Sequence, residues 1–172
     1  MTDLTMDAAN QLEPLYLRLG QLIREMDIVQ ADETWHRMQK PSGQGTSGKG
    51  WQWVFLGDEL DPNTGDLVGR LIYYVFRTSR SGETPVQVLG GTTGKLVVDA
   101  YSGYSKVTKP DGRTRGGCLA HGRRRFFVAH TQKIPEAEEA IGLIRDVYRV
   151  EHEAREQGVL GTEAHLRMRQ TR

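Results

Sequence analysis

KLVVDAYSGY, residues 95–104, places three apolar residues directly before an aspartate, Asp99. The same pattern occurs earlier in the chain, where IVQAD, residues 28–32, ends in Asp32. Short apolar runs of this kind are typical of buried strands, so each aspartate is expected at the carboxyl end of a strand. Neighbouring strands would bring the two carboxylates together. Because an acid after a strand is also a common turn or helix-capping residue, the pattern alone leaves both interpretations open.

Two further segments rich in β-forming residues lie between these runs. WQWVFL, residues 51–56, and LIYYVF, residues 71–76, predict an antiparallel hairpin with a turn cluster at residues 61–65. The Gly- and Ser-rich stretch 41–50 predicts a flexible loop. We expect a turn or two of helix near residues 85–89 and a further short strand within residues 116–121.

Helical periodicity marks both ends of the chain. Apolar residues at three- and four-residue spacing predict amphipathic helices over residues 9–26 and 136–157. Residues 123–127 are expected on another helix, and the polar tail from residue 158 on a loose one. The element order predicts an α/β fold, in which a mixed sheet is flanked by helices. We expect three parts: a helix leading into the core (1–27), the core (28–130) and a helical segment (131–172).

The composition is that of an ordinary folded domain. The chain has 172 residues, of which 37% are hydrophobic and 26% charged. No apolar run approaches the roughly 20 residues of a membrane-spanning helix, so no membrane partner is expected. Cys118 is the single cysteine, which excludes a disulfide framework. The acidic N-terminal segment lacks the apolar centre of a signal peptide, and we expect a cytoplasmic protein.

The net charge of +1 hides an uneven distribution of charge. Residues 1–86 carry 8 basic and 12 acidic side chains, whereas residues 87–172 carry 15 basic and 10 acidic ones. Most of the basic excess lies between residues 104 and 133, where eight lysines and arginines accompany the single acid Asp111. Such a segment suits a polyanion such as DNA, although many charge runs are simply solvated surface.

Two convergent aspartates would suit a divalent metal site. Carboxylates that face each other repel, and a bound cation relieves the repulsion. Mg²⁺ prefers oxygen ligands, takes few of them from protein, and leaves positions for water and phosphate. A pair of such ions supports phosphoryl transfer in many nucleases and polymerases. We therefore predict Mg²⁺ or Mn²⁺ at Asp32 and Asp99, with two ions in a complete enzyme.

Several segments together resemble one family, the insertion-sequence transposases of the IS66 type. They are ADETW (31–35), WQWVF (51–55), FRTSRSGETPVQVLGG (76–91), GKLVVDAYSGY (94–104), GGCLAHGRRRFF (116–127) and VYRVEHE (147–153). The resemblance covers most of the chain, in order and with matching spacing, and its combined motifs are specific although no single one is.

The resemblance implies an RNase H-like DDE catalytic core that performs metal-dependent cleavage and transfer of DNA strands. By position, Asp32 matches the first catalytic acid of the family and Asp99 the second. The implied partner is double-stranded DNA, both the transposon ends and the target, and a homo-oligomer is possible.

The chain departs from the family pattern at the third catalytic acid. Family members resemble one another in a DNN-x-x-E-R segment after a helical insertion, and this sequence has none. Glu151 lies on a predicted helix and is the remaining candidate, although the surface of the insertion is its more natural place. We expect a truncated core, and the sequence leaves two functions open: an active transposase fragment, or a catalytically inactive DNA-binding remnant.

Cys118 and His121 form a C-x-x-H pair that could supply two zinc ligands. A structural zinc site needs four ligands, and the chain has no second cysteine and no histidines at suitable spacing. The pair resembles a C-x-x-H feature found between the second and third acids of several transposase families. We therefore expect it to support the active site, or to be a small cysteine packed beside a histidine, and do not expect zinc.

Further residues are expected to bind DNA. Arginines can clamp phosphates, and the aromatic rings that follow Asp99 can stack on an unpaired end base. A solvent-facing turn for the three consecutive arginines and burial of the tyrosines against the sheet are equally open interpretations. The candidates are Arg113, Arg115, Arg123, Arg124, Arg125, Tyr101 and Tyr104.

Overall fold

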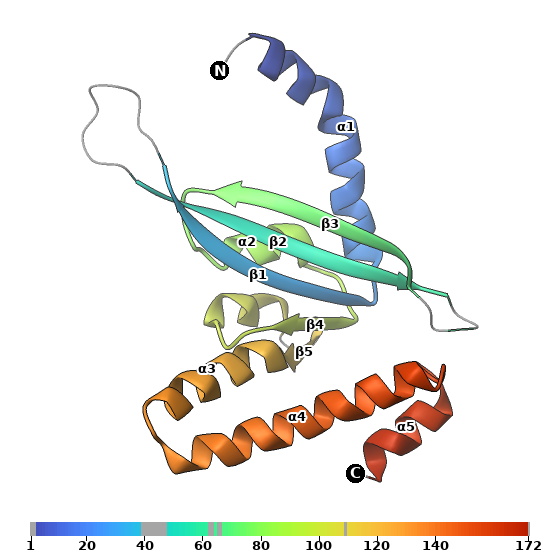
Figure 1. Ribbon diagram of the computed structural model, residues 1–172. Coiled ribbons are helices and arrows are strands. Elements are labelled where there is room, and N and C mark those ends of the chain that lie inside the picture. Colours follow the sequence, from blue (N-terminus) through green and yellow to red (C-terminus); the bar gives the residue numbers. More distant parts are fainter. Residues whose placement is uncertain (1–2, 39–47, 62–63, 65–66, 109, 172) are drawn as a thin grey trace. The chain divides into compact units, whose positions relative to one another are not determined.

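The protein alternates helices and strands in the order shown in Figure 1, a computed structural model. The structure describes residues 3–38, 48–61, 64, 67–108 and 110–171. Most of the loop expected at 41–50 and of the turn expected at 61–65 lies outside them. The elements are α1 (Asp3–Glu25), β1 (Ile28–Arg37), β2 (Lys49–Leu60), β3 (Leu67–Arg77), α2 (Glu83–Leu89), β4 (Lys95–Val98), the 3-10 helix η1 (Ser102–Val107), β5 (Thr114–Gly117), α3 (Leu119–Thr131), α4 (Pro135–Glu156) and α5 (Glu163–Gln170).

The chain divides into two compact units. The first comprises residues 1–59 and 70–117, and the second comprises residues 60–69 and 118–172. The first unit therefore holds nearly all of the sheet together with α1, α2 and η1, whereas the second holds the three C-terminal helices.

The five strands form one mixed sheet in the order β3-β2-β1-β4-β5. β1 pairs with β2 in the antiparallel sense, from Val29 opposite Gly57 to Arg37 opposite Lys49. The arrows of β2 and β3 also run in opposite directions in Figure 1. By contrast, β1 pairs with β4 and β4 pairs with β5 in the parallel sense. Three antiparallel strands followed by parallel ones are the expected RNase H-like arrangement, and the predicted fold class is confirmed.

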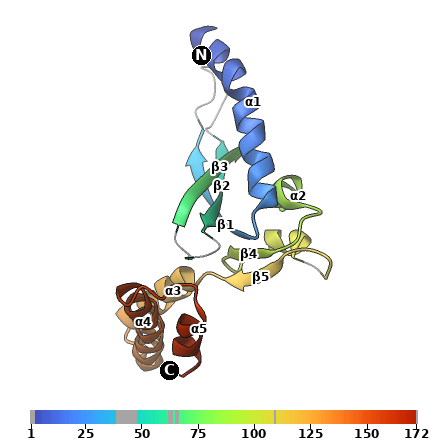
Figure 2. The same ribbon diagram turned by 90° about the vertical axis from the view of Figure 1, so that its right-hand side faces the viewer.

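One face of this sheet carries the hydrophobic core of the first unit. Successive side chains of a strand point to opposite faces, and in β1 Val29 and Ala31 are buried whereas Gln30 and Asp32 are exposed. Figure 2 shows α1 and α2 on the same side of the strands. The buried core comprises Ile23, Val29, Ala31, Trp53, Phe55, Val75, Val88, Leu89, Leu96, Val98, Tyr104 and Val107.

The N-terminal helix begins at Asp3, before the predicted start at residue 9. Residues 3–8 are helical although they lack the apolar periodicity on which the prediction rests. Only its last turns reach the core: Ile23 is fully buried, whereas Leu12 and Leu15 are more than half exposed. The carboxyl end of α1 is tied to α2, because Arg24 donates to the carbonyls of Val88 and Gly90 at 2.7 and 2.8 Å. These bonds satisfy carbonyls that the end of a helix leaves without partners.

Arg113 lies inside the first unit, with 1% of its surface exposed. Its guanidinium donates to the carbonyls of Arg24 and Met26, both at 3.0 Å, and to the hydroxyl of Thr92 at 2.8 Å. Longer bonds reach the carbonyls of residues 27 and 95. Burial lowers the pKa of Arg113. The expected DNA-binding role of Arg113 is therefore wrong in this structure, because its donors join the end of α1 to β4.

The second unit is helical. α4 buries Ala137, Ile144, Val150 and Ala154 at helical spacing, whereas Val147 and Tyr148, which the periodicity predicts on the buried face, are about half exposed. The short strand expected within residues 116–121 ends at Gly117, and α3 begins two residues later at Leu119. The tail contains a defined helix, α5, whose N-terminal Thr162 side chain accepts a hydrogen bond from the His165 amide. Among the described residues, no helix combines the length and the apolar character needed to cross a membrane.

Candidate active site

Asp32 lies in the middle of β1, not at its end as the sequence predicts. The strand continues to Arg37 because its antiparallel pairing with β2 extends that far, and Asp32 itself is opposite Val54. The parallel pairing of β1 with β4 stops earlier, with Gln30 opposite Val97. Asp32 therefore stands where the β4 side of β1 becomes free. Its side chain is on the exposed face, away from the core.

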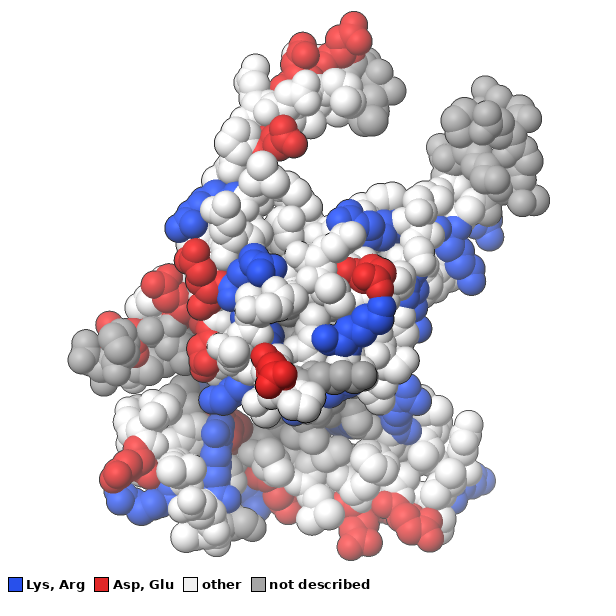
Figure 3. Space-filling model, turned by 180° about the vertical axis from the view of Figure 1, so that it is seen from behind, with Lys and Arg blue, Asp and Glu red and all other residues white. Residues whose placement is uncertain are grey.

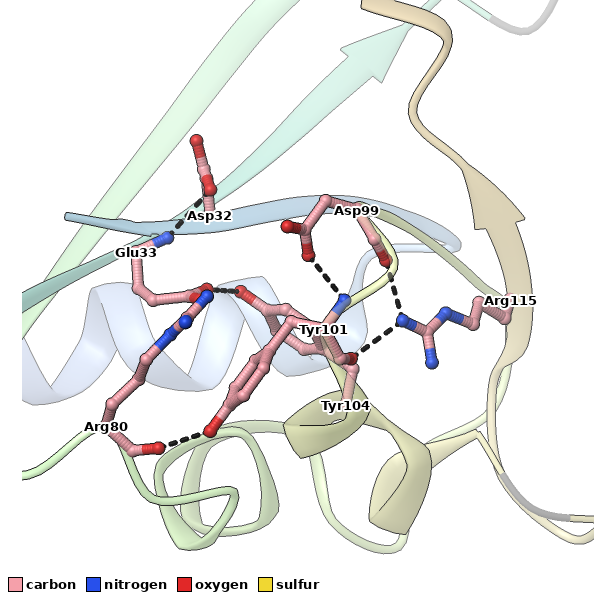
Figure 4. A network of polar contacts seen from close by, with 7 residues as sticks. All are labelled: Asp32, Glu33, Arg80, Asp99, Tyr101, Tyr104 and Arg115. Atoms are coloured by element: carbon pink, nitrogen blue, oxygen red, sulfur yellow. Dashed lines mark hydrogen bonds and ion pairs between the residues drawn. The ribbon is translucent and has the colours of Figure 1, made fainter. Parts of the chain in front are cut away.

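Asp99 follows the last residue of β4, as predicted. The register of the parallel pair sets Ile28 opposite Lys95 and Gln30 opposite Val97. The parallel pairs end there, two residues before each aspartate. Figure 4 shows Asp32 on β1 and Asp99 in the turn that follows β4. The Asp99 carboxylate also accepts a hydrogen bond from the Tyr101 amide at 2.9 Å, which holds the turn after β4.

Glu33 is a residue of this region that the sequence patterns do not single out. It continues β1, and its side chain leaves the strand on the side opposite to Asp32 (Figure 4). Only 1% of that side chain is exposed. A buried carboxylate requires donors, and Glu33 receives them from Arg80 and from the Tyr104 hydroxyl, the latter at 2.5 Å.

Arg80 is fixed from several directions. Its Nε and Nη2 atoms lie 2.8 and 2.5 Å from the same Glu33 oxygen. Its guanidinium carbon lies 4.0 Å from the ring centre of Tyr101 and 5.1 Å from that of Trp51. The Tyr101 hydroxyl donates to the Arg80 carbonyl. Burial alone would lower the pKa of Arg80, but the hydrogen bond and charge of Glu33 raise it.

The tyrosines after Asp99 belong to this network. Tyr104 is fully buried, and its ring lies 5.9 Å from those of Trp53 and Tyr101. Burial, followed by the Glu33 hydrogen bond, raises the pKa of the Tyr104 hydroxyl. The expected stacking of Tyr104 on a DNA base is therefore wrong for this structure, and its burial against the sheet is confirmed. Tyr101 is partly exposed, but its ring faces Arg80.

Arg115 binds the main chain beside Asp99. Its Nη2 atom donates to the carbonyls of Asp99 and Tyr101 at 2.6 and 2.8 Å (Figure 4). These bonds fix the turn that presents the Asp99 carboxylate. Arg115 is partly buried, so a contact with DNA phosphate stays a prediction for this residue.

The other predicted residues lie in the second unit. Cys118 and His121 stand at the start of α3, where the His121 amide donates to the Cys118 carbonyl. Arg123, Arg124 and Arg125 are exposed on the same helix. Arg123 and Arg124 line one shallow hollow, and Arg124 and Arg125 line another, so the three side chains spread around the helix as their spacing requires. Their contact with DNA stays a prediction.

The described basic residues of the segment 104–133 differ in their surroundings. Arg113 and Arg115 bind main-chain carbonyls in the first unit, whereas the arginines of α3 belong to the second. Figure 3 shows basic and acidic side chains interspersed on the face that it presents. Charge counted along the sequence therefore overstates the positive surface of this segment.

Glu151 is held by its own unit. It lies on α4, and both of its oxygens accept hydrogen bonds from Arg169 of α5 at 2.7 Å. His165 Nε2 is 3.3 Å from one of these oxygens. The hydrogen bond from Arg169 lowers the pKa of Glu151. This pair joins α4 to α5, and a catalytic role of Glu151 stays untested.

The donor set fits a hard cation in part. Asp32 and Asp99 supply carboxylate oxygens, the ligands that Mg²⁺ and Mn²⁺ prefer. Glu33 is not available, because Arg80 and Tyr104 occupy its oxygens. Within the described part of the chain, no group of three or more His, Cys, Asp and Glu side chains is placed to hold a metal. The two aspartates would leave most of a cation's shell to water and phosphate.

The comparisons with known proteins agree with this architecture. The model of the IS66 transposase family matches residues 1–172. Two relatives from Sinorhizobium fredii (strain NGR234) are similar: the uncharacterized protein y4qI is 30% identical over 77% of the chain, and the uncharacterized protein y4jD is 33% identical over 85%. The aligned part covers 26% and 29% of these relatives, so the chain spans less than a third of their length. No solved structure matches the chain.

Proposed function

Because the chain belongs to the IS66 transposase family, we propose that it carries part of a catalytic core that cuts and joins DNA strands. Asp32 and Asp99 are the acids of this proposed core, and double-stranded DNA is its substrate. The transposon ends and the target would be the two DNA partners of the complete enzyme.

The observation that supports the proposal is the register between β1 and β4. The parallel pairs run from Ile28 opposite Lys95 to Gln30 opposite Val97, and each aspartate follows two residues after the last pair. Both are rigidly supported: Asp32 by the ladder to β2, and Asp99 by the Tyr101 amide and by Arg115 on its carbonyl. Fixed carboxylates of this kind are what a metal-dependent phosphoryl transfer needs.

The residues have separate parts in the proposed chemistry. Asp32 and Asp99 would hold one or two Mg²⁺ or Mn²⁺ ions, which supply electrostatic stabilisation of the reacting phosphate and a more acidic water or hydroxyl. Tyr101 and Arg115 keep the Asp99 turn in one conformation. The hydrogen bond between Tyr104 and Glu33 lies on the opposite face of β1. It would keep the strand that carries Asp32 in one conformation.

A second function is favoured by one observation. Among the described residues, no third acid, histidine or cysteine joins the aspartates in a group that could hold a metal. The chain could therefore be an inactive remnant that still binds DNA and competes with a complete transposase.

A nicking assay separates the two functions. The purified chain is incubated with supercoiled plasmid and Mg²⁺ or Mn²⁺, beside Asp32→Asn, Asp99→Asn and Asp111→Asn variants. Asp111 is exposed in the turn before β5 and serves as the matched control. A catalytic core nicks the plasmid, loses that activity with either of the first two variants, and keeps it with Asp111→Asn. DNA binding without nicking would favour the remnant, and equal nicking by Asp32→Asn would contradict the assigned site.

A further inference from the structure

Arg80 joins β1 to the turn that follows β4. Through its side chain it binds Glu33, the neighbour of Asp32, and through its carbonyl it accepts from Tyr101, two residues after Asp99. Its guanidinium also lies over the Tyr101 ring. Asp99 is close enough to raise the pKa of Arg80, after the larger effects of burial, Glu33 and Tyr101. Arg80 is thus held on the Glu33 side of β1, which is opposite to the Asp32 side chain, and next to the turn that carries Asp99 (Figure 4).

The Glu33 contact leaves part of the Arg80 guanidinium unused. Glu33 takes the Nε and Nη2 donors with one oxygen, so the Nη1 donors are not used by Glu33. The two ends of the pair differ in exposure, since 40% of the Arg80 side chain is exposed against 1% of the Glu33 side chain. The buried Glu33 carboxylate holds the more exposed Arg80 guanidinium in place, so the remaining N–H donors of Arg80 are preorganised at the surface.

The acids of this region would repel DNA unless a positively charged side chain lay beside them. Asp32, Glu33 and Asp99 are three acids within a few residues of β1 and β4, and a DNA backbone that approached them would be repelled. Arginine binds phosphate through paired, directional N–H donors, and it does so best when its side chain is already ordered.

We propose that Arg80 is a phosphate-binding residue of the catalytic site, held by Glu33 and Tyr101 so that its free guanidinium edge contacts the DNA backbone beside Asp99. The inference rests on the proposed function and adds to it the residue that would position the DNA strand. Arg80 acts by binding the substrate, whereas Glu33 acts through Arg80 and is a positioning residue.

The test is DNA binding without metal, measured by fluorescence anisotropy with a labelled DNA duplex between about 50 and 200 mM salt. Arg80→Ala alone leaves the Glu33 carboxylate buried without its cation and could unfold the protein. The decisive variant therefore combines Arg80→Ala with Glu33→Gln, which removes the pair and restores charge balance. Thermal unfolding first verifies that this double variant is folded.

The expected result is a loss of affinity of about tenfold in the double variant, with the slope of log K against log salt reduced by about 0.9. Arg80→Lys together with wild-type Glu33 should recover part of the affinity, because a lysine keeps the charge and loses the directional donors. Arg77→Ala is the matched control: it removes the same charge three residues away, where the side chain donates to Gln87, and should bind DNA nearly as the wild type does.

A folded double variant that binds DNA with wild-type affinity and salt slope would overturn the inference, since Arg80 would then only neutralise Glu33. The nicking assay keeps this outcome separate from the proposed function. If wild-type protein nicks DNA and Asp32→Asn does not, the proposed function stands whatever Arg80 does. If wild-type protein neither binds nor nicks DNA, both proposals are wrong.

Discussion

The Tyr104 hydroxyl donates to the carboxylate of Glu33 at 2.5 Å, across 71 residues of chain. The two side chains come from η1 and β1, so the bond ties the segment after Asp99 to the strand that holds Asp32. Since Glu33 is 1% exposed, no water can readily replace the hydroxyl.

Tyr104→Phe therefore should lower the free energy of unfolding by about 2 kcal/mol, because a buried carboxylate loses one of its donors. Urea unfolding measures the change. Tyr74→Phe is the control, since the Tyr74 ring is 54% exposed and its substitution should change stability by less than about 0.5 kcal/mol. Equal stability of Tyr104→Phe and the wild type would mean that the hydroxyl does not support Glu33.

Arg113→Met should destabilise the protein by about 3 kcal/mol or more. The substitution keeps much of the apolar stem but removes the donors to the carbonyls of Arg24 and Met26 and to Thr92, and buried acceptors without partners are costly. Arg125→Met, at an exposed position of α3, removes the same charge and should stay within about 0.5 kcal/mol of the wild type. Urea unfolding of both variants checks this, and similar values for the two would contradict the structural role of Arg113.

Asp32, Asp99 and Glu33 show which parts of the site could be predicted from the sequence. Asp32 and Asp99 follow local apolar runs, so the pattern of each strand indicates its acid, and the parallel pairs of β1 with β4 end two residues before each of them. The role of Glu33 depends on how far β1 continues, and the pairing with β2 decides that. A local pattern contains no information on such a partner.

The basic residues illustrate the same limit. The sequence shows that Arg113 and Arg115 are charged but not which atoms surround them. In the structure their partners are main-chain carbonyls of residues up to 89 positions away, and carbonyls are the same in every residue type. The sequence therefore does not separate such arginines from exposed ones such as Arg125, for which contact with DNA stays a prediction.

The contribution of Glu151 to stability should depend on pH. Arg169 holds the pKa of Glu151 below its ordinary value in the folded state, so the stabilisation is complete above the unfolded-state pKa of about 4.3. It is lost as the pH falls through the lowered pKa of the folded state. Arg169→Gln should thus unfold at a lower temperature than the wild type at pH 7, and the difference should shrink in acid.

Thermal unfolding from neutral pH to below about pH 4 measures this convergence. Arg167→Gln is the matched control on the same helix, because its partner Glu163 is 87% exposed and such pairs contribute little. A difference between Arg169→Gln and the wild type that stays constant down to the lowest pH would show that Arg169 acts through packing and not through the charge of Glu151.

Gly94→Ala should be far more harmful than Gly91→Ala, although both glycines have positive φ and lie in the connection from α2 to β4. At Gly94, φ is +105° and an added Cβ would lie 2.4 Å from the Asp27 carbonyl oxygen. At Gly91, φ is +72° and no atom lies within 4 Å of the added Cβ. We expect a loss of about 1 kcal/mol for Gly91→Ala from backbone strain alone, and at least about 3 kcal/mol for Gly94→Ala. The additional loss arises because the main chain must shift where Lys95 donates to Asp27 and Thr114 donates to Gly94.

The shift of the main chain at Gly94 would also disturb the register of β4 beside β1. Gly94→Ala should therefore impair nicking at temperatures where the variant is still folded, whereas Gly91→Ala should not. Equal stabilities of the two variants in urea would contradict the close approach of Gly94 to Asp27.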